Sequence, residues 1–178
     1  KGLADWDIEP SLIKALTEAV KFAVYTPGSE AGMPVSILAS LQAPQIPWQE
    51  NREILREKIS STVTALLGLV GFTEVDPVRS REHILLANIF ENAWSQGKDL
   101  DLGELIMQTQ SPPFEKLGVF DVNSFFPEKD RFGLAMSLNN ILAAPAFQTW
   151  IEGQPLDVGS LLYETNGKPR HSVFYIAH

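Results

Sequence analysis

The chain has 178 residues, a net charge of −8 and no cysteine, and its 44% apolar content is that of a globular protein. Without cysteine it forms no disulfides and no cysteine-ligated metal site, and its acidic balance disfavours a surface that grips nucleic-acid phosphates. No run approaches the roughly 20 apolar residues of a membrane helix, and the first residues lack the apolar core of a signal peptide. We therefore expect a soluble, cytoplasmic protein.

The first elements alternate between helix and strand. Pro10 suits the first turn of a helix, and five apolar residues of helical period follow it: Leu12, Ile13, Leu16, Ala19 and Val20. Residues 21–26 and 35–41 have the composition of short strands. Between them, residues 26–34 predict a turn-rich loop, because prolines remove donors and glycines permit positive φ.

Three helical patterns come next. Residues 49–70 carry an apolar stripe, and Gly71 is a plausible C-terminal stop. The pair Asp76–Pro77 resembles the start of a second helix, with Asp76 as its N-cap. Asp101 and Glu104 form a capping-box variant that predicts a third, shorter helix. Together the three patterns predict a helical bundle.

The next segment is rich in aromatic residues. Residues 111–127 combine prolines with several large apolar side chains, which predicts an ordered loop that packs its aromatic rings inward. Pro127 restarts a helix, and Pro145 begins another short one. Residues 156–163 predict a last turn of helix before the end of the chain.

The chain ends in a pattern typical of a buried strand. Residues 170–178 contain the run Val173–Ile176, whose β-branched and aromatic content suits the middle of a sheet. Because such a strand is usually covered by further elements, the pattern predicts a segment of a longer chain. The fold class expected is mainly α (α+β), a helical bundle with a small sheet of short strands near 21–26, 35–41 and 171–178.

The search for catalytic motifs is negative. The sequence has no phosphate-binding loop, no dinucleotide-binding glycine fingerprint and no nucleophile elbow. His83, His171 and His178 lack metal-ligand spacing and are expected to be structural. The basic residues between Arg52 and Lys58 alternate with glutamates, which predicts a solvated surface. No catalytic, cofactor-binding or metal-ligating residue is therefore predicted.

Five blocks of the sequence, taken in order, resemble part of a bacterial HerA-like ATPase. The blocks are residues 22–29, 32–38, 132–142, 147–157 and 172–178, the last preceded by a Gly-Lys-Pro turn. HerA-like proteins belong to the HerA/FtsK group of P-loop motor ATPases. In that family the phosphate loop (Walker A) precedes the region resembled, and the acidic Walker B segment follows the terminal strand.

The resemblance implies a non-catalytic segment between the two nucleotide motifs. Residues 1–178 would form a single domain of a longer chain, with a helical insertion at about 49–162 framed by core strands at about 21–41 and 171–178. The parent would use ATP and Mg²⁺ to translocate or remodel DNA as a homo-oligomeric ring. DNA would be bound by the parent rather than by this acidic segment, and none of the family's catalytic residues is present to be carried over.

Two other hypotheses stay open. The chain could be a stand-alone α-helical protein-interaction module, with the aromatic loop from Phe114 to Phe126 as its partner site. Alternatively it could be a small enzyme whose site is assembled from scattered residues. The candidates for such a site are Asp121, Asn123, Asn139 and Asn140, although asparagines on a helix also cap neighbouring turns or face solvent.

Overall fold

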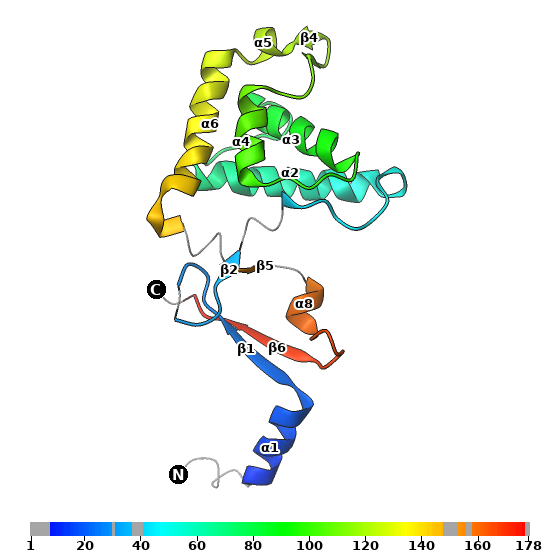
Figure 1. The fold of residues 1–178 in the computed structure, drawn as a ribbon, viewed down its shortest axis with the longest axis vertical. Helices are drawn as coiled ribbons and strands as arrows, with labels where there is room; N and C mark the ends of the chain where they lie inside the picture. The colour runs from blue at the N-terminus through cyan, green and yellow to red at the C-terminus, as the bar shows by residue number, and fades with distance from the viewer. Residues whose placement is uncertain (1–7, 30, 37–40, 148–152, 156–157, 177–178) are drawn as a thin grey trace. The chain divides into compact units, whose positions relative to one another are not determined.

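The structure is a computed structural model that describes residues 8–29, 31–36, 41–147, 153–155 and 158–176 (Figure 1). The chain divides into two compact units. Ser40–Phe147 forms one, called here the helical unit, and Lys1–Ala39 with Gln148–His178 forms the other, called the strand unit. The predicted mainly α fold with a few short strands is confirmed. None of the helices in the described ranges is both long and apolar enough to cross a lipid bilayer.

The helical unit is built from four longer helices and several short pieces. The longer helices are α2 (Arg52–Leu69), α3 (Arg81–Trp94), α4 (Leu102–Gln110) and α6 (Glu128–Ala143). The short pieces are η3 (Trp48–Glu50), β3 (Lys116–Leu117), β4 (Phe120–Asp121), α5 (Val122–Phe125) and η4 (Pro145–Phe147). This unit ends at Phe147, whereas the insertion expected from sequence extends to about residue 162.

Local signals explain most of the helix ends. The Asp101 carboxylate accepts a hydrogen bond from the Glu104 amide at 2.7 Å, which confirms the predicted N-cap of α4. Gly71 ends the turn after α2 with a φ of 94°, as its position predicted. The prediction for Asp76 is wrong: Ser80 caps α3, and Asp76 stabilises the turn before it by accepting from the Val78 amide. An aspartate side chain can serve either purpose, and here it forms the turn.

The core of the helical unit is centred on α3, which packs against α2 and α4, while α4 packs against α6 (Figure 1). Each helix buries one stripe of apolar side chains. On α3 the stripe includes Leu85, Leu86, Ile89 and Phe90, all fully buried. Phe90 meets Trp94 edge to face, with ring centroids 5.5 Å apart. The amphipathic periods read from sequence therefore correspond to a shared core.

Trp94 also joins α3 to the segment before α2, because its indole N–H donates to the Leu41 carbonyl at 3.0 Å. We expect Trp94→Phe to lower the free energy of unfolding of the helical unit by about 1–3 kcal/mol, because a buried acceptor loses its partner and the smaller ring leaves a void. Chemical denaturation followed by circular dichroism measures this change. A stability equal to that of the unsubstituted chain would contradict the assigned hydrogen bond.

The described part of the strand unit contains two separate two-stranded ladders rather than one sheet. Its elements are α1 (Pro10–Ala19), β1 (Lys21–Tyr25), β2 (Val35–Ser36), β5 (Gln154–Pro155), α8 (Val158–Leu162) and β6 (Arg170–Phe174). β1 pairs in parallel with β6, and β2 pairs in parallel with β5. Isolated bridges also join Tyr25 to Met33 and Tyr163 to Pro169. The single three-stranded sheet expected from sequence is therefore replaced by separate two-stranded ladders; residues 37–40 and 177–178 of the expected strands lie outside the described residues.

The strand near the end of the chain forms as predicted, but the expectation that it is buried is wrong. Val173 and Phe174 of β6 are 51% and 41% exposed. Ala23, Tyr25 and Val35 form the small core of this unit, with Leu161 of α8 packed against them. Since the β1–β6 ladder has only two strands, it gives each strand one neighbour and leaves apolar side chains of its other face in solvent.

Candidate functional site

Residues 111–127 fold into a small hairpin and one turn of helix rather than a loop. β3 and β4 pair antiparallel across a two-residue turn, in which Gly118 adopts a φ of 61°. α5 follows β4 directly. The predicted inward packing is right for Phe126, which is 1% exposed, and wrong for Phe120, which is 61% exposed. Val119 at the tip of the hairpin is also exposed.

Two of the four candidate residues lie together in this segment. The Asp121 carboxylate caps α5 by accepting from the Asn123 amide at 2.8 Å. Asn139 and Asn140 lie on α6 and do not line the same hollow. The scattered enzyme site suggested by sequence is therefore not assembled from all four residues.

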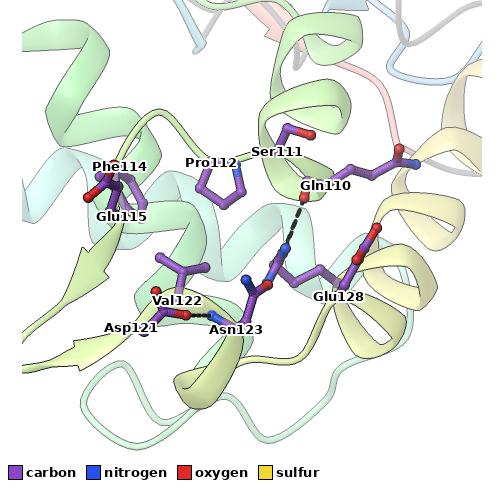
Figure 2. Close-up of a pocket in the computed structure, with 10 residues that line it drawn as sticks. Gln110, Ser111, Pro112, Phe114, Glu115, Asp121, Val122, Asn123 and Glu128 are labelled. Carbon is purple, nitrogen blue, oxygen red and sulfur yellow. Dashed lines mark hydrogen bonds between the residues drawn. The ribbon is translucent and has the colours of Figure 1, made fainter.

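Asp121 and Asn123 line an open hollow of about 490 Å³ beside the end of α4, the hairpin and the start of α6 (Figure 2). Its wall includes the Pro112 ring and the Phe114 side chain, with Gln110 and Ser111 at the end of α4. Its charged lining residues are Glu115, Asp121, Glu128 and Arg131.

Arg131 is the most constrained side chain of this hollow. It is 5% exposed, and its guanidinium donates to three acceptors. Nε and Nη2 both donate to the Gln110 carbonyl at 3.2 Å, while Nη1 donates to the Phe126 carbonyl at 2.6 Å and to Asn123 Oδ1 at 2.9 Å. Gln110 is the last residue of α4 and Phe126 follows α5. Arg131 therefore ties α6 to the ends of two other helices.

The acceptors of Arg131 are two backbone carbonyls and one amide oxygen, and none is a carboxylate. Carbonyls at the ends of helices carry partial negative charge and lack intrahelical partners. A guanidinium supplies five N–H donors in a rigid fork, so it satisfies several such carbonyls at once. Asn123 completes the set with its side-chain oxygen. The bonds of Arg131 thus have a structural explanation that requires no ligand.

The chemistry of the hollow does not resemble an active site. Its lining joins three carboxylates to one guanidinium that is occupied by protein acceptors, so its local charge is unfavourable for a phosphate group. Among the residues that line the hollow, Ser111 alone carries a hydroxyl, and none is a histidine that could act as a base. Across the described part of the chain, no three His, Asp or Glu side chains come together as metal ligands. We therefore regard the hollow as a structural junction.

The sequence analysis missed Arg131, although a signal for it was available. Arg131 stands on the stripe of α6 that also contains Leu134, Leu138 and Ile141, all buried. A charged residue at a core position of a helical period must find several polar partners nearby. Gln110 and Glu128 carried no comparable signal, because both are ordinary residues of helix ends.

His83 and Arg56, also discussed from sequence, have structural positions, whereas His178 lies outside the described residues. His83 is 2% exposed in α3, and its Nε2 lies 3.3 Å from the Ser60 carbonyl, so it is a core histidine. Arg56 of α2 pairs with Glu91 of α3, with Nε to Oε2 at 3.0 Å. The pKa of Arg56 is raised, chiefly by the hydrogen bond to Glu91 and secondly by the negative charge of Glu91. This basic stretch thus contributes to contact between two helices at the surface.

Comparison with known proteins adds no relative: no family model, curated protein or solved structure matches the chain.

Proposed function

We propose that this chain is the non-catalytic helical segment of a bacterial HerA-like P-loop ATPase, lying between its Walker A and Walker B motifs. The parent protein would use ATP and Mg²⁺ to translocate or remodel DNA as a ring of identical subunits in the cytoplasm. In this proposal the segment itself carries neither the nucleotide site nor the main DNA-binding surface.

The observation that supports this proposal best is the parallel pairing of β1 with β6. The ladder stays in register from Lys21, paired with Arg170, to Tyr25, paired with Phe174. Parallel neighbours must be joined by a crossover connection, and here the crossover contains the whole helical unit. A helical unit that lies, in the sequence, between two strands paired in parallel is the arrangement expected of an insertion in a P-loop ATPase core.

The composition of the two strands agrees with this proposal. Parallel strands are usually covered on both faces and are apolar on both. Phe22 and Val24 of β1 and Val173 of β6 are apolar yet about half exposed, as expected of strands taken from a larger covered sheet. The blocks that resemble HerA-like proteins include these strands, residues 22–29 and 172–178.

The charge of the segment argues for a role other than nucleic-acid binding. Its net charge is −8, and three of the four charged residues that line its hollow are carboxylates. Proteins that bind phosphate backbones concentrate Lys and Arg instead. Contact with neighbouring subunits or with partner proteins is the more economical role for the helical unit.

The test compares the 178-residue chain with the product of its complete reading frame. We expect calorimetry with ATP and Mg²⁺ to detect binding by the complete product and none by the 178-residue chain, because the phosphate loop would lie outside it. The complete product should also hydrolyse ATP faster when DNA is added. A complete reading frame without a phosphate loop, or ATP binding by the 178 residues alone, would refute the proposal.

A second candidate function is a stand-alone protein-interaction module. It is favoured by the hairpin tip, where Val119 is 84% exposed and Phe120 is 61% exposed. Large apolar side chains exposed side by side often mark a contact with another protein. A reading frame that lacks nucleotide motifs would leave this hypothesis as the better one.

A further inference from the structure

The turn that joins α8 to β6 contains Asn166, the one asparagine of the sequence that is followed by glycine. Asn166 and Gly167 are both exposed. A side-chain carboxamide can be attacked by the backbone nitrogen of the next residue, which closes a five-membered ring. A side chain on that next residue obstructs the attack, and glycine has none. An added Cβ at Gly167 would meet no atom within 4 Å, so open space surrounds the attacking peptide.

The turn also holds the Asn166 carboxamide close to the peptide that would attack it. Asn166 Oδ1 accepts a hydrogen bond from the Lys168 amide at 2.9 Å, so the side chain folds back along the Gly167 peptide as an Asx turn. This bond draws electron density from Oδ1 and makes the attached Cγ more electrophilic. Attack within one chain is favoured where the two reacting groups are held near each other. The carboxamide is therefore both placed and polarised for attack by the Gly167 nitrogen.

One hydrogen bond of the folded turn opposes this attack. The Gly167 amide donates to the Glu164 carbonyl at 2.8 Å, and an amide must give up its proton before its nitrogen can attack. Residues 165–167 are exposed, and local opening of such a turn requires far less free energy than global unfolding. The attack would thus start from the opened turn, and base should accelerate it.

The other asparagines do not combine these features. Five lie inside helices: Asn88, Asn92, Asn123, Asn139 and Asn140. The sixth, Asn51, directly precedes α2 and is followed by an arginine. Each is followed by a residue with a Cβ, which obstructs ring closure. Within a helix the dihedral angles are also fixed by the backbone hydrogen bonds, so ring closure would require the helix to open. The chain therefore provides its own internal controls.

We propose that Asn166 is a site of spontaneous deamidation and isomerisation. The Gly167 nitrogen forms a bond to Asn166 Cγ, and the carboxamide nitrogen takes up the proton and leaves as ammonia. Water then opens the resulting succinimide ring at either carbonyl, which produces aspartate or isoaspartate at this position. The reaction consumes only water and needs no oxidant or reductant. This inference is independent of the ATPase proposed above.

Isoaspartate would alter the turn, because it adds one methylene group to the backbone. The hydrogen bonds donated by the Gly167 and Lys168 amides both depend on the length of this turn. The same turn leads into β6, where the Lys21 amide donates to the Pro169 carbonyl at 2.9 Å and Lys21 pairs with Arg170. Isoaspartate should therefore loosen the start of the β1–β6 ladder. Aspartate keeps the normal backbone and should leave the ladder intact.

The test incubates the folded 178-residue chain in mildly alkaline buffer and follows every asparagine by peptide mapping. Mass spectrometry detects the change from amide to acid, and electron-transfer dissociation distinguishes isoaspartate from aspartate. We expect conversion at Asn166 to be at least about tenfold faster than at any other asparagine, with isoaspartate among the products. Asn166→Gln is the matched control, because its longer side chain must close a larger ring, and it should stay unconverted. Conversion at Asn166 no faster than at Asn123 would overturn the proposal.

Hydrogen exchange of the incubated chain provides a second measurement. Chains that contain isoaspartate at position 166 should lose protection in β6 near Arg170 and His171. Freshly prepared Asn166→Asp carries the same added charge on a normal backbone and should keep the protection of the unsubstituted chain. Equal protection in the isoaspartate form and in Asn166→Asp would overturn the expected effect on the ladder.

Discussion

Replacing Gly153 with alanine is expected to destabilise the strand unit by more than about 3 kcal/mol. A Cβ at this position would overlap the backbone of Val35 and lie 2.5 Å from the Ser36 amide nitrogen. These are backbone atoms, which cannot move aside as a flexible side chain can. The β2–β5 ladder begins at the next residue, where Gln154 pairs with Val35, so relief of the clash would break the ladder. Hydrogen exchange resolved by mass spectrometry should reveal lost protection in β1 and β6.

Two other glycines provide controls for that experiment. Gly167→Ala should lower the free energy of unfolding by only about 1–2 kcal/mol. Its φ of 81° disfavours alanine, although an added Cβ would meet no atom within 4 Å. Gly133→Ala, in the interior of α6 and also free of contacts, should stabilise the helical unit by about 0.5–1 kcal/mol. If hydrogen-exchange protection of the strand unit in Gly153→Ala equals that in the unsubstituted chain, the close approach of Gly153 to the Val35 and Ser36 backbone is disproved.

Arg131→Ala is expected to lower the stability of the helical unit by more than about 3 kcal/mol. The substitution removes the donors for the Gln110 and Phe126 carbonyls and for Asn123 Oδ1. Each buried acceptor left unpaired costs about 1–3 kcal/mol. Urea denaturation followed by circular dichroism at 222 nm measures the loss.

The conservative variant separates geometry from charge. Arg131→Lys should recover part of the lost stability, because an ammonium group keeps the charge but not the fork of five donors. Glu128→Gln is the matched control, since Glu128 lines the same hollow but is exposed. A loss in Arg131→Ala no larger than that in Glu128→Gln would show that the buried network contributes little to folding.

The helices of this protein could be predicted from sequence because their signals are local. An apolar stripe of helical period predicted α2, and the capping residue Asp101 predicted the start of α4. The pair Asp76–Pro77 and Pro127 predicted helices in the regions of α3 and α6. The start of α3 was placed too early, because Asp76 forms a turn as readily as a cap. The hairpin at Gly118 was missed, since its strands are only two residues long and carry no period.

The candidate site could be predicted only in part. Asp121 and Asn123 are near in sequence and stay near in the fold. Asn139 and Asn140 are distant in sequence and remain away from them. Arg131 was missed because its partners are backbone carbonyls at the ends of α4 and α5, and backbone groups leave no mark in a sequence.

The sequence alone thus determined the mainly helical class, because periodicity and caps act within a few residues. Only the tertiary structure decided which strands pair and what covers them. β1 and β6 are strands by their own composition. Their parallel pairing joins one segment that precedes the helical unit in the sequence to one that follows it. Burial depends on which elements lie over a face, and that is a property of distant contacts. For this reason the strand predicted to be buried has half-exposed side chains.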